Sequence, residues 1–213
     1  MNENKVIMFL TVCAVIISVL AIGIGYLSVS NLVTKISGLV TTGEANLTVE
    51  TRAEINFTSR YVNFSSGRVN QASTAASLFT VGAGTVSGGN WTASSGMIIE
   101  NIGNVNVSLN LSVAKNASQF IGGTNPVYEW NLSDTATEAD SCTNIAGNGD
   151  SPRMNIFYQA NTTPSIALGG LGCAVFRSRA ASDRIRLDFN LTVPEDSLTG
   201  ALGDVITATA TAL

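Results

Sequence analysis

An uncharged apolar run, Val6–Leu27, constrains the fold of this chain more than any other stretch. Its 22 residues include no charge and no proline. A helix of this length is about 33 Å long, enough to cross the ~30 Å hydrocarbon core of a bilayer. Lys5 and the terminal amine are the positive charges before the run, and a long polar segment follows it. The sequence therefore predicts a transmembrane helix with the C-terminal part translocated to the cell surface.

A removable signal peptide is the alternative to a retained anchor. Signal peptides usually have an apolar region of about 7–15 residues before a cleavage site with small residues. Ser28-Val29-Ser30 could serve as such a site, but the run is longer than this class requires. A lipoprotein signal ending at Cys13 fits less well, because this cysteine lies inside the run. A retained anchor is the favoured interpretation.

An amphipathic helix is predicted to continue beyond Leu27. Its apolar residues recur at spacings of three and four, which is the period of a helix face: Val29, Leu32, Val33, Ile36, Leu39 and Val40. Gly38 and the segment 41–43 end the pattern, so residues 1–43 form the first predicted domain. The stripe either packs on its own domain or packs on helices of other copies, and Gly23 and Gly25 would allow close approach. The second option predicts a homo-oligomer.

The remaining chain, residues 44–213, predicts a single β-domain. Apolar and polar residues alternate at 45–57, and most regularly at 105–113. Strands are also expected at 61–64, 77–81, 97–100, 127–132, 154–158 and 173–176, and residues 185–193 and 205–213 read as a final hairpin. Residues 82–96 read as a loop in which Trp91 caps an edge of the core. Nine or ten short antiparallel strands predict a β-sandwich.

Composition excludes several functions. The net charge of −4 and the pI of about 4.7 argue against a nucleic-acid partner. The chain has no histidine, which removes the usual serine and cysteine triads and ordinary zinc chemistry. No phosphate-binding loop is present in the sequence. Together with the lack of histidine, this absence leads us to predict no cofactor and no metal site. Four carboxylates could serve a glycosidase but have the spacing of solvent-facing residues: Glu100, Glu129, Asp188 and Glu195. We expect a protein that is not an enzyme.

Two charged clusters leave alternatives open. Five oxygen-bearing residues could bind Ca²⁺ or form a solvated loop: Glu138, Asp140, Asn144, Asn148 and Asp150. Half of the arginines lie within ten residues, at Arg177, Arg179, Arg184 and Arg186. The last two share a strand face with Asp188, which favours a cross-strand ladder. The alternative is a contact with acidic glycans or with a neighbouring subunit.

Cys142 and Cys173 are the only cysteines beyond the apolar run. An even pair outside the cytoplasm most simply forms a disulfide. A metal site would need further ligands, and no histidine is available. The sequence predicts a disulfide that stabilises the fold by about 3–4 kcal/mol.

Ten asparagines lie in Asn-x-Ser/Thr sequons and are candidates for N-glycosylation: Asn46, Asn56, Asn63, Asn90, Asn106, Asn110, Asn116, Asn131, Asn161 and Asn190. A strand that alternates apolar residues with Asn and Thr also generates sequons without any selection for glycans. We expect these positions to face solvent and several to be modified.

Three segments carry a resemblance to known proteins. ENIGNVNVSLNLSV resembles a strand–turn–strand of secreted immunoglobulin-like modules. FIGGTNPVYEWNLSD and DRIRLDFNLTVPEDSLTGALGDVITATATA resemble anchored surface proteins of small-genome (DPANN-type) archaea. This resemblance implies an immunoglobulin-like sandwich, a surface location and archaeal N-glycosylation. The overall plan is also similar to archaeal pilins and archaellins, although Asn4-Lys5 leads into Val6 without their cleavage motif.

These observations predict a non-enzymatic cell-surface protein with a structural or adhesive role. Its predicted partners are the membrane, neighbouring copies, surface glycans and other surface proteins. One alternative is a filament subunit whose N-terminal helices bundle in the fibre core. A further alternative is a carbohydrate-binding or carbohydrate-active module.

Overall fold

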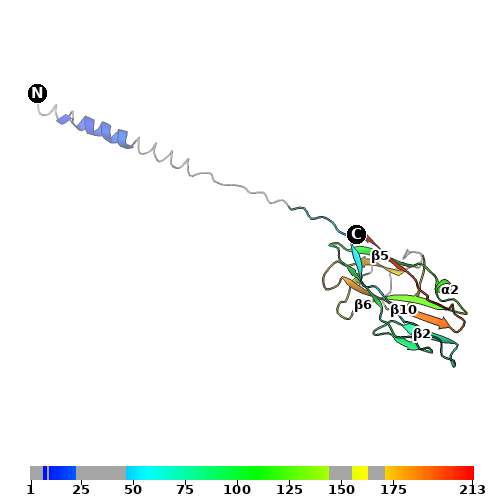
Figure 1. Ribbon diagram of the computed structural model, residues 1–213. Helices are drawn as coiled ribbons and strands as arrows, with labels where there is room; N and C mark the ends of the chain where they lie inside the picture. Colours follow the sequence, from blue (N-terminus) through cyan, green and yellow to red (C-terminus); the bar gives the residue numbers. More distant parts are fainter. Residues whose placement is uncertain (1–6, 9, 23–46, 144–154, 163–170) are drawn as a thin grey trace. The chain divides into compact units, whose positions relative to one another are not determined.

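The computed structural model describes residues 7–8, 10–22, 47–143, 155–162 and 171–213 (Figure 1). The chain divides into two compact units, Met1–Val49 and Glu50–Leu213. In the first unit, residues 7–8 and 10–22 are α-helical. Among these described residues, no helix is both long enough and apolar enough to cross a membrane. Residues 6, 9 and 23–27 of the predicted span, and the whole predicted stripe from Val29 to Val40, lie outside the described residues.

The second unit is an antiparallel β-domain with one short helix. Its elements are β1 (Ile55–Ser59), β2 (Ala75–Phe79), β3 (Thr85–Ser87), β4 (Met97–Asn101), β5 (Val107–Val113), α2 (Ala117–Phe120), β6 (Val127–Asp134), β7 (Cys142–Thr143), β8 (Tyr158–Gln159), β9 (Leu171–Phe176), β10 (Arg184–Pro194) and β11 (Ile206–Ala212). Seven strands form one sheet and four form another. The predictions of a mainly β fold and of antiparallel pairing are confirmed.

β10 is the central strand of the larger sheet (Figure 1). On one side, its first part pairs with β4 and its last part pairs with β2. On the other side it pairs with β6 along Ile185–Thr192. β1 extends the sheet from β4, β3 extends it from β2, and β8 extends it from β6. Three two-stranded pieces are thus joined through one strand.

The smaller sheet has the order β11-β5-β9-β7. Its inner face and that of the larger sheet share one apolar core. The largest fully buried side chains come from both sheets and include Trp130, Phe176, Leu109, Leu111, Ile185 and Leu187. Along β5 the odd-numbered residues are buried and the even-numbered ones half-buried, as the sequence alternation predicts. Tyr128 and Trp130 lie on one face of β6 as expected, and both are buried.

The predicted strand at 45–57 is wrong over most of its length. Regular strand begins only at Ile55, and Leu47 and Val49 are exposed. Among the strands that the structure describes, none lies beside the segment before Ile55. It runs instead along the turn after β4, where Asn104 Oδ1 accepts a hydrogen bond from the Arg52 N–H at 2.7 Å. Residues 61–64 likewise form no strand, although Val62 and Phe64 pack on the core.

The predicted C-terminal hairpin is also wrong. β10 and β11 belong to different sheets, and β11 pairs with β5 from Ile206 to Ala212. The segment between them crosses from one sheet to the other. Three small elements of the described chain were not predicted: β3, which lies in the glycine-rich region, the two-residue strand β7, and α2. The helix α2 begins with a capping box in which Asn116 and Gln119 bond reciprocally, a signal that the sequence does contain.

Candidate functional sites

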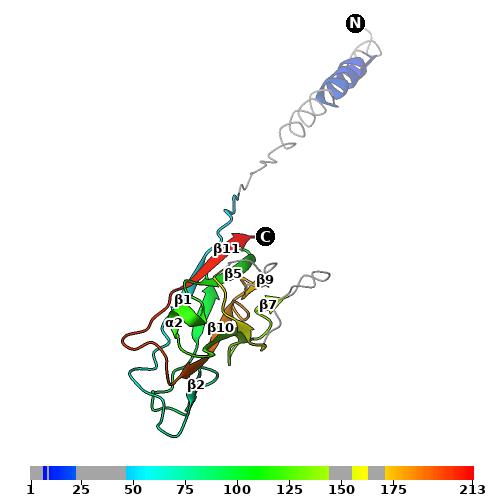
Figure 2. The same ribbon diagram turned by 90° about the vertical axis from the view of Figure 1, so that its right-hand side faces the viewer.

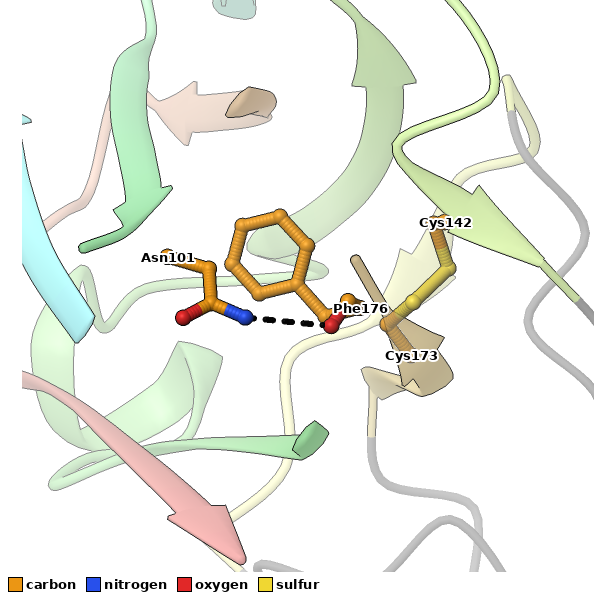
Figure 3. Close-up of a disulfide and its surroundings, with 4 residues drawn as sticks. All are labelled: Asn101, Cys142, Cys173 and Phe176. Atoms are coloured by element: carbon orange, nitrogen blue, oxygen red, sulfur yellow. Dashed lines mark hydrogen bonds between the residues drawn. A yellow bond between two sulfur atoms is a disulfide. The ribbon is translucent and has the colours of Figure 1, made fainter. Parts of the chain in front are cut away.

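The disulfide between Cys142 and Cys173 joins β7 to β9 within the smaller sheet (Figure 3). The two Cα atoms are 5.7 Å apart and Cys173 is fully buried. Beside the bond, the buried Asn101 donates its Nδ2 hydrogens to the carbonyls of Phe176 at 3.2 Å and Val105 at 3.0 Å. The predicted disulfide is confirmed, and it lies next to a polar anchor that ties β4 to β9.

Replacing both bonded cysteines by serine is expected to lower the free energy of unfolding by about 3–4 kcal/mol, because the reduced chain gains conformational entropy when unfolded. Urea unfolding followed by circular dichroism measures this difference. Cys13 serves as the internal control: a folded, non-reduced sample should show one reactive thiol. Three reactive thiols, or a non-reduced digest without a Cys142–Cys173 linked peptide, would contradict the assignment.

The sequon asparagines do not all face solvent. Asn56, Asn63, Asn90, Asn106 and Asn116 are exposed, whereas Asn110, Asn161 and Asn190 are half-buried. Asn46 lies outside the described residues. The expectation of a solvent-facing position is wrong for Asn131, which is 4% exposed. This asparagine lies on β6 opposite Asp188 of β10. On the other side of β6, the strand β8 pairs with the two residues before Asn131.

Several exposed sequon asparagines have a local structural role. The Oδ1 atom of Asn90 accepts from the Arg68 N–H at 2.7 Å, and that of Asn106 accepts from the Ser178 N–H at 3.2 Å. Asn63 and Asn116 use Oδ1 in the same way. These bonds fix the amide orientation through the oxygen and leave the nitrogen, the atom that carries an N-glycan, out of the contact. Asn190 differs because its Nδ2 donates to Glu129 at 2.7 Å.

Arg186 and Asp188 form a partly buried ion pair on β10. Arg186 Nε lies 2.9 Å from Asp188 Oδ1, and the side chains are 21% and 2% exposed. The Thr80 hydroxyl donates to Asp188 at 2.9 Å and accepts from the Phe189 N–H at 2.8 Å. A Cβ on Gly96 would come within 2.4 Å of the carboxylate, so only glycine fits there. The expectation of a solvent-facing Asp188 is therefore wrong.

Arg184 occupies the next position on this face of β10. Its Nη2 lies 3.0 Å from Glu100 Oε1, and this hydrogen bond raises the pKa of the guanidinium. Glu138 Oε2 accepts from the N–H groups of Asp183 at 3.0 Å and Arg184 at 2.9 Å. Burial, followed by the nearby Glu138 carboxylate, raises the pKa of Asp183. The predicted solvated cross-strand ladder is present in part: the Arg184–Glu100 pair joins β10 to β4, whereas the Arg186–Asp188 pair lies within β10 and is largely buried.

The other candidate residues are not brought into one site. Glu100, Glu129 and Asp188 each have their own partner on the larger sheet, and Glu195 is exposed after β10. Of the proposed calcium ligands, Glu138 binds backbone N–H groups and Asp140 is exposed. Asn144, Asn148 and Asp150 lie outside the described residues. Within the described part of the chain, no group of three or more potential metal ligands is present.

A groove of about 510 Å³ is the feature that sequence reasoning missed. Inward-facing residues of β2, β6 and β10 line it, together with residues 62–69, Trp91 and the segment before β11. Both carboxylate oxygens of Asp204 are buried there without a hydrogen-bond partner of regular geometry. Burial, followed by the nearby Asp204 carboxylate, raises the pKa of Tyr128, so this phenol stays protonated. An apolar wall with a few buried polar groups is typical of ligand sites.

Trp91 closes one side of this groove. A Cβ on Gly67 or Gly89 would come within 2.4 Å or 2.5 Å of the indole, so the ring is held against two glycines. The side chain packs on the core, as predicted for this residue. No periodic pattern marks Asp204 or the two glycines as neighbours of the groove, because all three lie in irregular segments.

Comparison with known proteins adds no assignment. No family model, curated protein or solved structure matches the chain.

Proposed function

We propose that the chain is a non-enzymatic cell-surface protein with a structural or adhesive role, held at the membrane by its N-terminal apolar segment. The Cys142–Cys173 bond carries this proposal. Disulfides of this kind persist in oxidising compartments and are rare in the cytosol. If the N-terminal apolar segment stays in the membrane and the β-domain is translocated, the disulfide lies in an oxidising compartment.

The proposed β-domain is an immunoglobulin-like sandwich that carries N-glycans, as in the surface proteins of small-genome archaea that the sequence resembles. Two antiparallel sheets around one core support the sandwich. Its disulfide joins two strands of the same sheet, whereas antibody domains link their two sheets. The five exposed sequon asparagines support glycosylation.

A filament subunit is the second candidate, and the exposed apolar surface of the N-terminal helix motivates it. The apolar side chains of its described residues are exposed around the helix, from Ile7 at 62% to Ile22 at 71%. An exposed apolar surface of this extent marks a site of contact with a membrane or with another protein. Lipid would cover it in an anchored protein, and helices of neighbouring copies would cover it in a fibre.

Cell fractionation tests the proposal and separates the two candidates. In a host that transfers N-glycans, added protease should digest the β-domain on intact cells. Detergent should then release an anchored protein as small particles, whereas a filament should remain as fibres visible by negative-stain electron microscopy. A β-domain that becomes protease-sensitive only after cell lysis would overturn both candidates.

Glycan occupancy should follow exposure. Asn106→Gln is expected to lower the mass of the mature protein by one glycan, because Asn106 is exposed and its oxygen makes the local contact. Asn131→Gln is the matched control and should leave the glycan mass unchanged, because Asn131 is buried. Intact-mass spectrometry measures both. A glycan on Asn131 and none on Asn106 would contradict the structural explanation.

A further inference from the structure

β11 is a long strand with one open side. It lies at the edge of the smaller sheet and pairs only with β5 among the strands of the described chain (Figure 2). The pairing runs without a register shift from Ile206 to Ala212. The segment contains no charged residue and no proline. An edge strand of this kind is a template for pairing with another chain.

The other edges of the two sheets are blunted. β3 has three residues, and β7 and β8 have two each. β1 has five residues, a register shift between Phe57 and Ser59, and Arg60 directly after it. Short strands, bulges and flanking charges are the devices that prevent pairing between sheet edges. β11 uses none of them.

The hydrogen bonds to β5 show which backbone groups of β11 remain free. The Val205 carbonyl accepts from Ala114 at 3.0 Å, and the Leu213 N–H donates to Asn106 at 3.1 Å. In an antiparallel pair, alternate residues bond to the same neighbour. The odd-numbered residues of β11 therefore bond to β5, and the even-numbered ones direct their N–H and C=O groups to the open side: Ile206, Ala208, Ala210 and Ala212.

The pattern of side chains on β11 is self-complementary. Thr207, Thr209 and Thr211 are exposed and alternate with Ala208 and Ala210, which pack on the core. If two copies of β11 pair antiparallel about Thr209, each threonine faces a threonine, Ala208 faces Ala210, and Ile206 faces Ala212. Cross-strand Thr–Thr pairs are favourable. The free backbone groups then meet in the correct phase and form about eight hydrogen bonds.

This register also covers two exposed apolar residues. Val205 is 65% exposed and Leu213 is 62% exposed, and they flank the threonines on the same face. Pairing about Thr209 places Val205 of each copy opposite Leu213 of the other. A shift by two residues in either direction leaves strand residues unpaired and separates these side chains. The sequence of β11 thus favours a second copy of β11 as its partner and fixes the register of the pairing.

We propose that β11 pairs antiparallel with β11 of a second copy of this chain about a two-fold axis at Thr209, which joins the two smaller sheets into one. This contact is isologous. It uses only the β-domain and is independent of any association through the N-terminal helix.

Single cysteines test this register in the full-length protein. Cys13→Ser is introduced throughout, and Cys142 and Cys173 remain bonded. Thr209→Cys should form a disulfide-linked dimer under mild oxidation, because residue 209 faces itself. Thr207→Cys and Thr211→Cys should each form no disulfide-linked dimer alone, since the two copies of each cysteine lie about 13 Å apart in the paired strands, beyond the reach of a disulfide. Mixing these two variants should give a linked heterodimer.

The opposite pattern would overturn the proposal. If all three variants cross-link alone to a similar extent, the dimers arise from random collision. If Thr209→Cys does not cross-link while its circular dichroism spectrum is that of the parent, the pairing does not occur.

A charge variant checks that the contact holds the copies together. Thr209→Lys places two like charges face to face at the axis and should weaken dimerisation at least tenfold in light scattering. Its unfolding midpoint should stay that of the parent, because Thr209 is exposed. Thr85→Lys on the edge strand β3 is the matched control and should leave dimerisation unchanged. Equal effects of the two variants, or no effect of Thr209→Lys, would overturn the proposal.

Discussion

Leu109→Asp is expected to unfold the β-domain. Leu109 is fully buried at the centre of β5, where it pairs with Ala210 on one side and Cys173 on the other. Loss of a buried leucine costs about 2–5 kcal/mol, and an unpaired carboxylate in an apolar core adds several more. A domain has a total stability of about 5–15 kcal/mol. The near-ultraviolet circular dichroism signal should therefore be lost at neutral pH.

Asn110→Asp is the matched control one residue further along the strand. Asn110 is half-buried on the opposite face, between Thr209 and Gly172. The substitution keeps the size of the side chain, so the unfolding midpoint in urea should change little. Protein from a host without N-glycosylation avoids a second effect through the lost sequon. Equal destabilisation by the two variants would show that the face assignment of β5 is wrong.

Asp188→Ala is expected to give the second largest loss of stability. It removes the acceptor for Arg186 Nε and for the Thr80 hydroxyl in a network in which both Asp188 and Thr80 are buried. Leaving one partner of a buried ion pair unpaired costs about 3–5 kcal/mol. The lower end of this range applies, because Arg186 also donates to the Thr80 and Gly82 carbonyls. Urea unfolding gives the difference in the free energy of unfolding.

A double variant distinguishes the unpaired charge from the loss of packing. Replacing Asp188 by Leu and Arg186 by Met removes both charges and keeps the apolar volume. Pairs replaced in this way often recover most of the stability that a single replacement loses. Full recovery is not expected, because Thr80 still loses its acceptor. A double variant less stable than Asp188→Ala would show that the ion pair itself is not the source of the loss.

Local alternation allowed the strands to be predicted, and it did not allow their neighbours to be predicted. β5, β6 and β10 each bury one face in a shared core, which leaves a period of two in the sequence. A period of two shows which face of a strand is buried, but it does not show which other strand pairs with it. The sequence of β11 fits beside β10 as well as beside β5, and only the packing of two sheets decides between them.

The candidate sites show the same limit. The disulfide could be predicted from the even pair of cysteines beyond the apolar run and the absence of histidine. The burial of Asp188 could not, because groups that cover it lie outside the regular strands: Gly96, and Thr80, whose hydroxyl donates to the carboxylate. The burial of Asn131 is likewise not visible in the alternation of β6, since Trp130, Asn131 and Leu132 are buried in succession.

The central position of β10 has a consequence for how the protein is made. Without β10, the larger sheet is three separate strand pairs, none of which buries a core on its own. Phe189 of β10 bonds to Thr80, which lies 109 positions earlier in the chain. Non-local pairing of this kind makes folding slow. The two sheets are therefore expected to close only after β10 and β11, the last two strands of the described chain, have been synthesised.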